Sequence, residues 1–351
     1  MRLLLIGRGT QGRAGMHLEP FADWHRAIRH KLNIRLNRVD VQSLAETEWA
    51  VEANPADVAM IMVHWSESPG DVVAMFERLH ARSPRPKLIF LDWFDQASSP
   101  FFGVLPFVGA YVKRQLLRDR ALYLHEFAGG TPFTDFYTWH FDYDLAGWHF
   151  GSSPSADQLH KLHLGWGLGV QTDFRRASKF NHWINVRWDR RSFDLNARIG
   201  MGKPERHEWY QDYRRRVIDQ MGRLGGRFTV TGTERISSQA YWKEMRRSRI
   251  AFSPFGWGEV CLRDFEAVCS GALLLKPSMA HIETRPNIYS ENETYIAVEW
   301  DLSDLEEKCA RCLEHPEEAQ RIAQKAHRIY AGYFESDGFL DDLRRILAAV
   351  D

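Results

Sequence analysis

The amino-acid sequence predicts an α/β protein built from two Rossmann-like, doubly wound domains that face each other across a cleft. Short apolar runs alternate with helical stretches, which is typical of parallel sheets covered on both faces. This alternation stops near residue 122 and restarts near residue 180, and 351 residues exceed the usual size of one core. We expect an N-terminal domain at 1–175, a C-terminal domain at 176–335 and a last helix at 336–351 that crosses back to the first domain.

The first half predicts four strands separated by helices. Runs such as RLLLI and KLIFLDW are apolar and end at polar or glycine residues. The expected strands are 2–6, 34–41, 57–65 and 87–93, and the expected helices are 17–31, 43–52 and 71–81. From 122 to 179 the sequence is rich in Gly, His and aromatic residues, and we expect irregular structure there.

The second half repeats the pattern. HWINVRW is the expected first strand, and the helix that follows ends at a Gly-Gly pair. The expected strands are 182–188, 227–233, 250–253, 272–277 and 294–300. The expected helices are 205–226, 237–249, 261–271, two between 303 and 334 divided near Pro316, and 338–350.

Charge and composition limit the partners. The chain has 46 basic and 46 acidic residues, so its net charge gives no general attraction to nucleic acid, and we expect no nucleic-acid partner. No apolar run approaches the roughly 20 residues that span a bilayer. We expect a cytoplasmic protein and leave open a peripheral association with membranes.

The four cysteines all lie in the last third of the chain, which is a poor distribution for a disulfide framework. Cys309 and Cys312 form a C-x-x-C that could join Cys261 and Cys269 in a zinc site. Zinc ligand pairs usually lie on turns, and this pair falls in an expected helix, so we favour small core residues and expect no metal.

The stretch from 252 to 271, FSPFGWGEVCLRDFEAVCSG, is the strongest candidate site. Gly256 and Gly258 flank Trp257 between a strand and a helix, where backbone can approach a ligand closely and the helix start offers N–H groups to a phosphate. Glu266 lies on that helix and could accept two hydrogen bonds from ribose hydroxyls. The alternative is that Trp257 packs over the sheet end and Glu266 pairs with an arginine.

The run SPFGWGEVCLRDFEAVCSGALLLKP resembles the donor-binding segment of GT-B glycosyltransferases, particularly the exostosin-like type. The resemblance is specific over about 249–286 and implies that Glu266 holds the nucleotide ribose. Many retaining members carry a glutamate where this chain has Gly258. Glu259, one place later, is the candidate sugar contact.

The resemblance also implies cationic groups at a diphosphate, for which the planar guanidinium is well suited. The segment after the expected strand 182–188 is rich in arginine, and Arg263 opens the motif helix. The alternative for these side chains is a solvated surface. The diphosphate candidates are Arg191, Arg198, Lys203 and Arg263.

Transfer of a sugar requires a base for the acceptor hydroxyl. Loops that follow strands of the first domain supply His17, Asp92 and Asp95 as candidates, each with a structural role as its alternative. Gly7, Gly9 and Gly12 match a dinucleotide-binding pattern, but the second strand is polar and we expect this loop to shape the acceptor pocket.

The resemblance implies transfer of a sugar from a nucleotide-diphosphate donor to a glycan, lipid-linked or protein acceptor hydroxyl, in polysaccharide or related biosynthesis. It implies no metal and no cofactor besides the nucleotide-sugar substrate. The alternatives are an epimerase or hydrolase acting on nucleotide sugars, and a carbohydrate-binding protein without catalysis.

Overall fold

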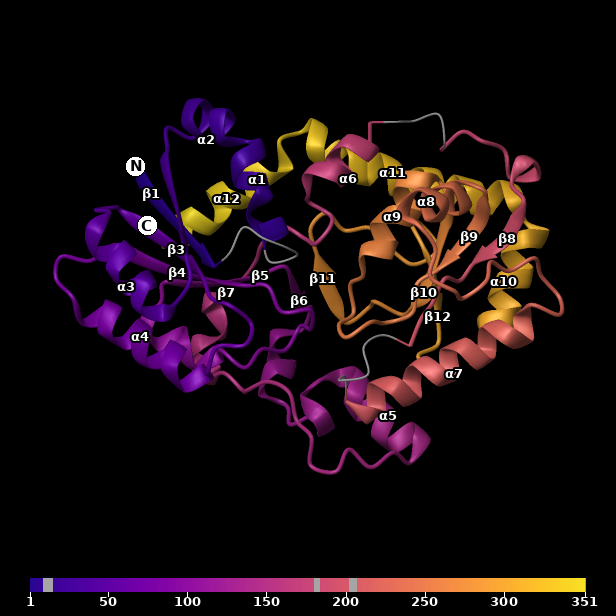
Figure 1. Ribbon diagram of the computed structural model, residues 1–351, viewed down its shortest axis with the longest axis horizontal. Coiled ribbons are helices and arrows are strands. Elements are labelled where there is room, and N and C mark those ends of the chain that lie inside the picture. The colour runs from indigo at the N-terminus through magenta and orange to yellow at the C-terminus, as the bar shows by residue number, and fades with distance from the viewer. Residues whose placement is uncertain (9–14, 180–183, 202–206, 351) are drawn as a thin grey trace. The chain divides into compact units, whose positions relative to one another are not determined.

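The computed structural model describes residues 1–8, 15–179, 184–201 and 207–350, and it divides into two compact units. Unit 1 comprises residues 1–172, 282–285 and 335–351, and unit 2 comprises residues 173–281 and 286–334 (Figure 1). Within the described ranges, no helix is long and apolar enough to cross a membrane.

Unit 1 is built on a six-stranded parallel sheet in the order β2-β1-β3-β4-β5-β7. The chain reverses its direction of strand addition between β1 and β3, and the carboxyl ends of strands at such a point are where ligands bind in open α/β sheets. The strands are β1 (Arg2–Arg8), β2 (Arg35–Val41), β3 (Val58–Met62), β4 (Lys87–Asp92), β5 (Ala110–Lys113) and β7 (Leu162–Leu164).

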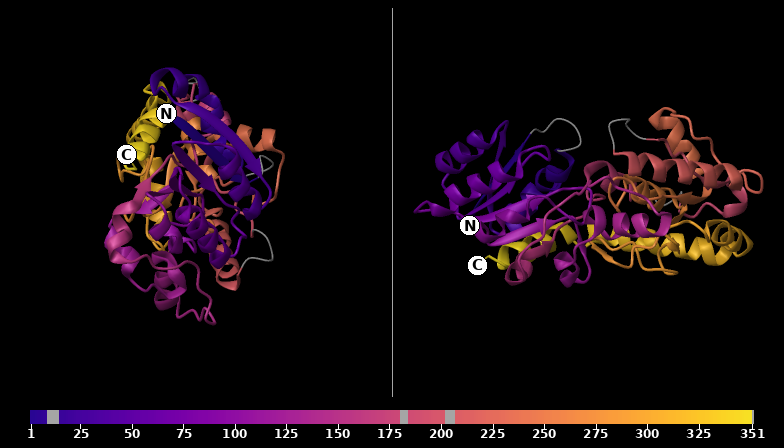
Figure 2. Two further views of the ribbon diagram at one scale, coloured as in Figure 1. Left: turned by 90° about the vertical axis from the view of Figure 1, so that its left-hand side faces the viewer. Right: turned by 90° about the horizontal axis from the view of Figure 1, so that it is seen from below.

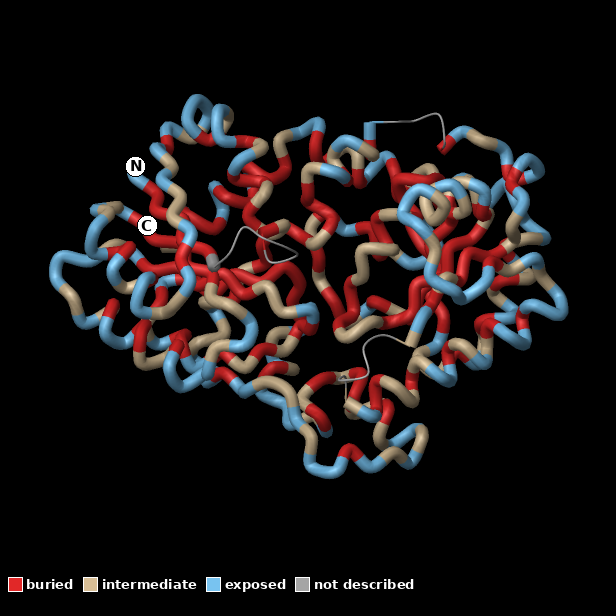
Figure 3. The backbone as a smooth tube through the Cα atoms, in the orientation of Figure 1, coloured by how far each residue is buried: buried red, intermediate tan, exposed pale blue. Residues whose placement is uncertain are grey.

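Helices cover this sheet. In α4, Pro69 follows the N-cap Ser68, whose hydroxyl accepts a hydrogen bond from the Asp71 amide. The buried face of α4 repeats at helical spacing, and β3 is buried at every position, which places the core between them (Figure 3). The helices of this part are α1 (Glu19–Asp23), α2 (His25–Lys31), α3 (Leu44–Ala53) and α4 (Pro69–Ala81).

The last helix, α12 (Gly338–Ala348), packs in unit 1 beside residues from the start of the chain (Figure 2). The Phe339 ring lies edge-on to Phe21 and Trp166, with centroid distances of 5.2 and 5.0 Å. Aromatic contacts of this kind add to the apolar area that the helix buries.

Two expectations for the middle of the chain are wrong. The region from 122 to 179 holds α5 (Pro132–Phe141), α6 (Thr172–Ala177), the edge strand β7 and, within the described residues, 3-10 turns at Arg120–Leu124, Ala128–Gly130 and Ala156–Lys161. Strands β5 and β6 (Gln115–Leu117) were not predicted, because β5 ends at Lys113, β6 begins at Gln115 and Arg114 lies between them. Residues 282–284, which the predicted boundaries place in the C-terminal domain, form the unpredicted strand β11 (Ile282–Thr284), which pairs antiparallel with β6 and belongs to unit 1.

Unit 2 holds a four-stranded parallel sheet in the order β12-β10-β9-β8. A single bridge joins Leu195 to Val230, so the expected strand at 227–233 is reduced to one pairing. The strands are β8 (Phe193–Asn196), β9 (Ser248–Phe252), β10 (Leu273–Pro277) and β12 (Ile296–Val298). The helices are α7 (Glu208–Leu224), α8 (Ser238–Arg246), α9 (Leu262–Ser270), α10 (Leu305–Glu314) and α11 (Pro316–Glu335).

The first strand of unit 2 was predicted at the wrong place. Residues 184–190 form turns and a 3-10 helix, and the strand comes instead at β8. The apolar run HWINVRW misled the prediction, because Ile184 and Trp188 are buried without being in the sheet. Arg191, which was expected after the strand, therefore precedes it.

Candidate functional site

The carboxyl ends of β8 and β9 form the candidate donor site of unit 2. With the bridge at Val230 counted as the second strand, the order along the sheet reverses between β8 and β9. A parallel α/β sheet opens a ligand-binding crevice at that reversal. The helix after β9 is α9, whose start faces the same end of the sheet.

Arg263, in the first turn of α9, lies across this reversal. Its guanidinium donates hydrogen bonds to the carbonyl of Phe252, at the end of β9, and to the carbonyl of Arg198, just beyond β8. A guanidinium has five N–H donors, so bonds to these carbonyls leave others for an anionic ligand. Arg263 is half-buried, which keeps it within reach of a substrate.

Glu266 follows one turn later on the same face of α9. The Tyr241 hydroxyl, from α8, donates a hydrogen bond of 2.6 Å to its carboxylate. Burial and the neighbouring Glu266 raise the pKa of Tyr241, while Arg263 opposes the rise, so the phenol stays a donor. The tyrosine thereby fixes the orientation of a half-buried carboxylate beside Arg263.

Below this surface, Asp264 is fully buried. Its carboxylate accepts hydrogen bonds from the Cys261 amide at the N-cap of α9 and from the Tyr289 hydroxyl at 2.6 Å. The buried Lys276 ammonium lies 3.2 Å from the same carboxylate. These contacts anchor the start of α9 to β10 and position the residues above.

The glycine loop is compact. The Gly256 amide donates to the Gly258 carbonyl at 3.0 Å, and a β-carbon at Gly256 would lie 3.3 Å from the Cys261 sulfur. Trp257 stacks on Trp209 of α7 with centroids 5.6 Å apart, which is the packing role considered as the alternative. The loop backbone remains the predicted edge of the site, while the indole belongs to the wall behind it.

The other donor candidates fall in different places. Glu259 is buried in the loop before α9, and its sugar contact stays a prediction. Lys203 lies outside the described residues. Arg198 makes a two-pronged ion pair with Glu244, at 2.7 Å for each contact, so its guanidinium is already neutralised and its carbonyl serves to hold Arg263.

Arg191 corrects the prediction most clearly. It precedes β8 and therefore lies at the amino end of the sheet, opposite the reversal described above. Its buried guanidinium donates to the carbonyls of Ser248 and Ser270, and burial lowers its pKa to about 10. The misplaced first strand explains the error, because a residue after a strand and one before it lie at opposite edges.

Two site residues were missed in the sequence. Asn196 ends β8 and Ser253 follows β9, and both are buried. Within the described part of the chain, neither the Asn196 amide nor the Ser253 hydroxyl has a hydrogen-bond partner. Buried polar groups are nearly always paired, so these two fit a ligand at the strand ends. A polar residue ending each strand was the available signal.

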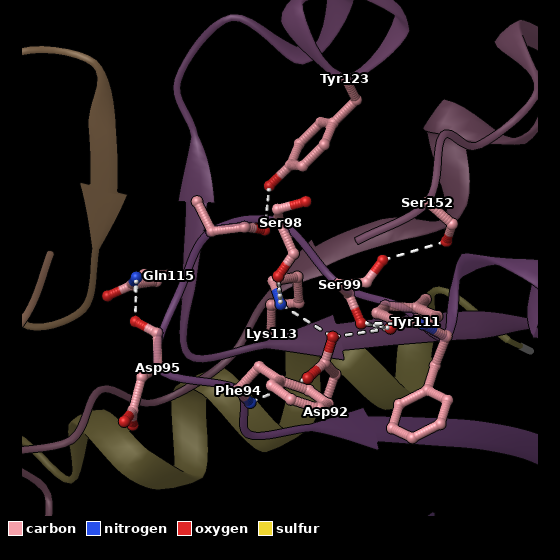
Figure 4. Close-up of polar contacts among 12 residues, drawn as sticks. Asp92, Phe94, Asp95, Ser98, Ser99, Tyr111, Lys113, Gln115, Tyr123 and Ser152 are labelled. Atoms are coloured by element: carbon pink, nitrogen blue, oxygen red, sulfur yellow. Dashed lines mark hydrogen bonds and ion pairs between the residues drawn. The ribbon is translucent and has the colours of Figure 1, made fainter. Parts of the chain in front are cut away.

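In unit 1, Asp92 occupies a closed network at the ends of β4 and β5 (Figure 4). Its carboxylate lies 2.7 Å from the Lys113 ammonium, and both side chains are fully buried. The Tyr111 hydroxyl donates to the same carboxylate at 2.6 Å, and the Phe94 amide donates to its other oxygen at 2.9 Å. The geometry corrects the catalytic prediction for Asp92, because no substrate hydroxyl reaches a carboxylate enclosed in this way.

His17 and Asp95 remain together as open candidates. The His17 imidazole stacks on Trp93 at 4.8 Å, and burial together with the Arg114 charge lowers its pKa to about 3, against an opposing effect of Asp95. Asp95 keeps about half of its side chain exposed and pairs with Arg114 at 2.7 Å. Asp95 is the charged base candidate of the two, and His17 is neutral at physiological pH.

Three comparisons with known proteins bear on this geometry. Residues 206–343 match the family model described as "Glycosyl transferase-like". No curated protein matches.

Solved structures share the fold across the whole chain. An alpha-glucosyltransferase in complex with UDP-glucose and DNA containing an abasic site matches with a TM-score of 0.53 and 10% identity, over 99% of both chains. An alpha-glucosyltransferase with UDP and a 13-mer DNA containing a central A:G mismatch matches with a TM-score of 0.51 and 9% identity, again over 99% of both chains.

The expectation of no nucleic-acid partner, which rested on the balanced net charge, is wrong. Proteins of this fold are seen in complex with DNA, so a balanced net charge does not exclude nucleic acid. A local basic surface can bind phosphates whatever the total charge of the chain.

The fold and the matched domain agree with the resemblance found in the motif around Glu266. Both units show the doubly wound parallel sheets expected of the GT-B fold. The family match begins before α7, ends within α12 and includes the whole motif helix α9. Residues 206–343 therefore match a glycosyl transferase-like domain, and the chain as a whole has the GT-B fold, as the sequence predicted.

Proposed function

We propose that the donor is a nucleotide-diphosphate sugar bound at the ends of β8 and β9, and that the sugar passes to an acceptor hydroxyl held by unit 1. The observation that carries the proposal is Arg263, which spans the two strand ends with Glu266 one turn beyond it. UDP-glucose in a solved glucosyltransferase of the same fold supports a donor of this class.

The proposed roles follow from the chemistry of each group. Arg263, the start of α9 and the loop amides bind the diphosphate, and Glu266 accepts hydrogen bonds from the ribose hydroxyls. In the reaction, the acceptor oxygen bonds to the anomeric carbon, the bond from that carbon to the diphosphate breaks, and the nucleoside diphosphate leaves. Asp95 takes the proton from the acceptor oxygen.

The proposal includes transfer without a metal ion, since Arg263 and the helix start supply positive charge where the diphosphate leaves. Activity should therefore persist in excess EDTA. We also propose a cytoplasmic protein, consistent with the four free cysteines of the described chain. Cell fractionation tests that assignment.

A thermal-shift panel of UDP, GDP, ADP and their glucose conjugates tests the donor. A ligand that binds only the native state raises the melting temperature, so one base should stand out. Glu266→Gln should remove most of that shift, while Glu307→Gln, an exposed acid on α10, should leave it unchanged. A panel without any shift would contradict the proposal.

A further inference from the structure

Unit 1 contains a cavity of about 420 Å³ to which none of the roles proposed above is assigned. It lies within the connection between β6 and β7, against the loop that follows β4. Its volume falls in the range of small-molecule sites. Its walls come from residues 117–132 and 149–153, together with Ser98.

Aromatic side chains form part of the wall. Tyr123 is 5% exposed, and its hydroxyl is fixed by donating to the Ala97 carbonyl at 3.1 Å and accepting from the Leu117 amide at 3.0 Å. The Phe127 ring lies 4.6 Å from the His125 imidazole, in an edge-on arrangement. Such rings offer flat apolar surface to the C–H face of a sugar.

Polar side chains line the cavity beside these rings. The hydroxyls of Ser98, Ser152 and Ser153 and the imidazoles of His125 and His149 line the same cavity. Each can both donate and accept hydrogen bonds, as the hydroxyls of a sugar require. Figure 4 shows Tyr123, Ser98 and Ser152 arriving from three separate segments near Lys113.

The charge of the lining selects among ligands. Among the described residues, the cavity lining contains the acidic Glu126 and no lysine or arginine. A site for a phosphodiester backbone needs cationic side chains, so this cavity does not suit DNA or a phosphorylated ligand. A neutral, polyhydroxylated molecule fits it best.

Two glycines with positive φ keep the cavity walls in place. Gly130 has φ of 86°, and a β-carbon there would meet the Phe150 carbonyl oxygen at 1.8 Å. Gly151 has φ of 109°, and its β-carbon would meet the Ser98 hydroxyl at 2.2 Å. Only glycine lets these segments approach so closely, and this approach shapes the cavity.

We infer that this cavity binds a sugar unit of a neutral oligosaccharide acceptor. The inference rests on the proposed glycosyl transfer and names the acceptor class. The ring faces of Tyr123 and Phe127 bind the apolar face of the sugar, and the serine and histidine side chains bind its hydroxyls.

The test measures binding of maltotriose, cellotriose and chitotriose to the full chain by saturation-transfer NMR, and then the KM of the best binder in a transfer assay. Phe127→Ala and Ser153→Trp should each raise that KM at least tenfold, the first by removing a ring and the second by filling the cavity from an exposed position. Trp49→Ala, an exposed tryptophan on α3, should leave the KM unchanged.

Donor hydrolysis and the thermal shift by nucleotide separate this inference from the proposed function. If nucleotide binds but no oligosaccharide does, or both cavity variants keep the wild-type KM, the inference is overturned while the donor site stands. The inference is also overturned if the protein transfers sugar to duplex DNA and Ser153→Trp does not impair that transfer. If oligosaccharide binds through Phe127 but no nucleotide binds, the cavity is supported and the proposed function fails.

Discussion

Each of the two units buries an aspartate–lysine pair at the carboxyl end of its sheet, and the two pairs are held differently. In unit 1, Asp92 ends a strand and its carboxylate lies 2.7 Å from the Lys113 ammonium. In unit 2, Asp264 lies in the first turn of α9, and Lys276 is 3.2 Å away. The unit 1 pair joins two strands, whereas the unit 2 pair ties a helix start to a strand.

The comparison shows which carboxylates are available to a substrate. Asp92 and Asp264 each also accept a hydrogen bond of 2.6 Å from a tyrosine hydroxyl, which leaves them enclosed. Two or three residues further on, Glu266 and Asp95 are partly open to solvent. In both units the buried acid holds the backbone, and the neighbouring open acid carries the proposed chemistry.

The largest expected effect is on the free energy of unfolding, when the lysine of either buried pair is removed. Lys113→Met should lower the free energy of unfolding by about 3–5 kcal/mol, because it leaves Asp92 charged and buried. Lys276→Met should cost less, since the Lys276 ammonium lies 3.2 Å from its carboxylate, against 2.7 Å for Lys113. Urea unfolding measures both.

Lys308→Met is the matched control for these two variants. Its partner is Asp304, 3.8 Å away at the N-cap of α10 and partly exposed, so the loss should stay below about 0.5 kcal/mol. If Lys276→Met lowered the free energy of unfolding more than Lys113→Met, the unit 2 pair, not the unit 1 pair, would be the stronger of the two.

The second effect separates two arginines of unit 2. Arg263→Ala should weaken nucleoside-diphosphate binding about 10- to 100-fold, the worth of roughly 1.5–3 kcal/mol for a hydrogen-bonded charge. Arg191→Ala should instead reduce stability and leave the affinity of the folded protein intact, because its bonds lie at the other end of the sheet. Calorimetric titration and thermal unfolding give the two readouts. Equal loss of affinity in both variants would show that the sheet end was assigned wrongly.

The sequence predicted the helices and most strands of the fold because their apolar periodicity is strong. The two helices divided at Pro316 and the strand–loop–helix unit around Arg263 are confirmed. Strands β5 and β6 were missed because Lys113, Arg114 and Gln115, where the two strands meet, are polar in the sequence, although tertiary contacts bury all three.

The site could be predicted only in part, since the sequence does not reveal which charges are paired. Asp92 and Asp95 are three residues apart and look alike in the sequence, yet one is enclosed and the other exposed. Arg191 failed for another reason, a strand placed about ten residues too early. Pairing and strand position are both set by distant residues.

A third effect tests how the open acid of unit 2 is held. Tyr241→Phe removes the hydroxyl that donates to Glu266 and should weaken nucleotide binding by about 1 kcal/mol, or roughly fivefold. The loss should vanish for a 2′,3′-dideoxynucleotide, which lacks the ribose hydroxyls that Glu266 is proposed to bind. The same loss with both nucleotides would place the effect of Tyr241 elsewhere.

The smallest expected effect concerns His17, next to the open acid of unit 1. Its pKa is lowered to about 3 from the usual 6.5, chiefly by burial, so the unfolded chain binds a proton more readily than the folded one. Stability should therefore fall as the pH drops below 6.5, by roughly 0.5 kcal/mol at pH 6 after allowance for partial exposure. His17→Phe keeps a ring to stack on Trp93 and should remove this part of the acid sensitivity. Measuring the unfolding free energies of both proteins at pH 7.5, 6 and 5 checks the sign of this effect. If the two plots of unfolding free energy against pH are parallel, the pKa of His17 is not lowered by folding. The histidine, not Asp95, would then be the better base.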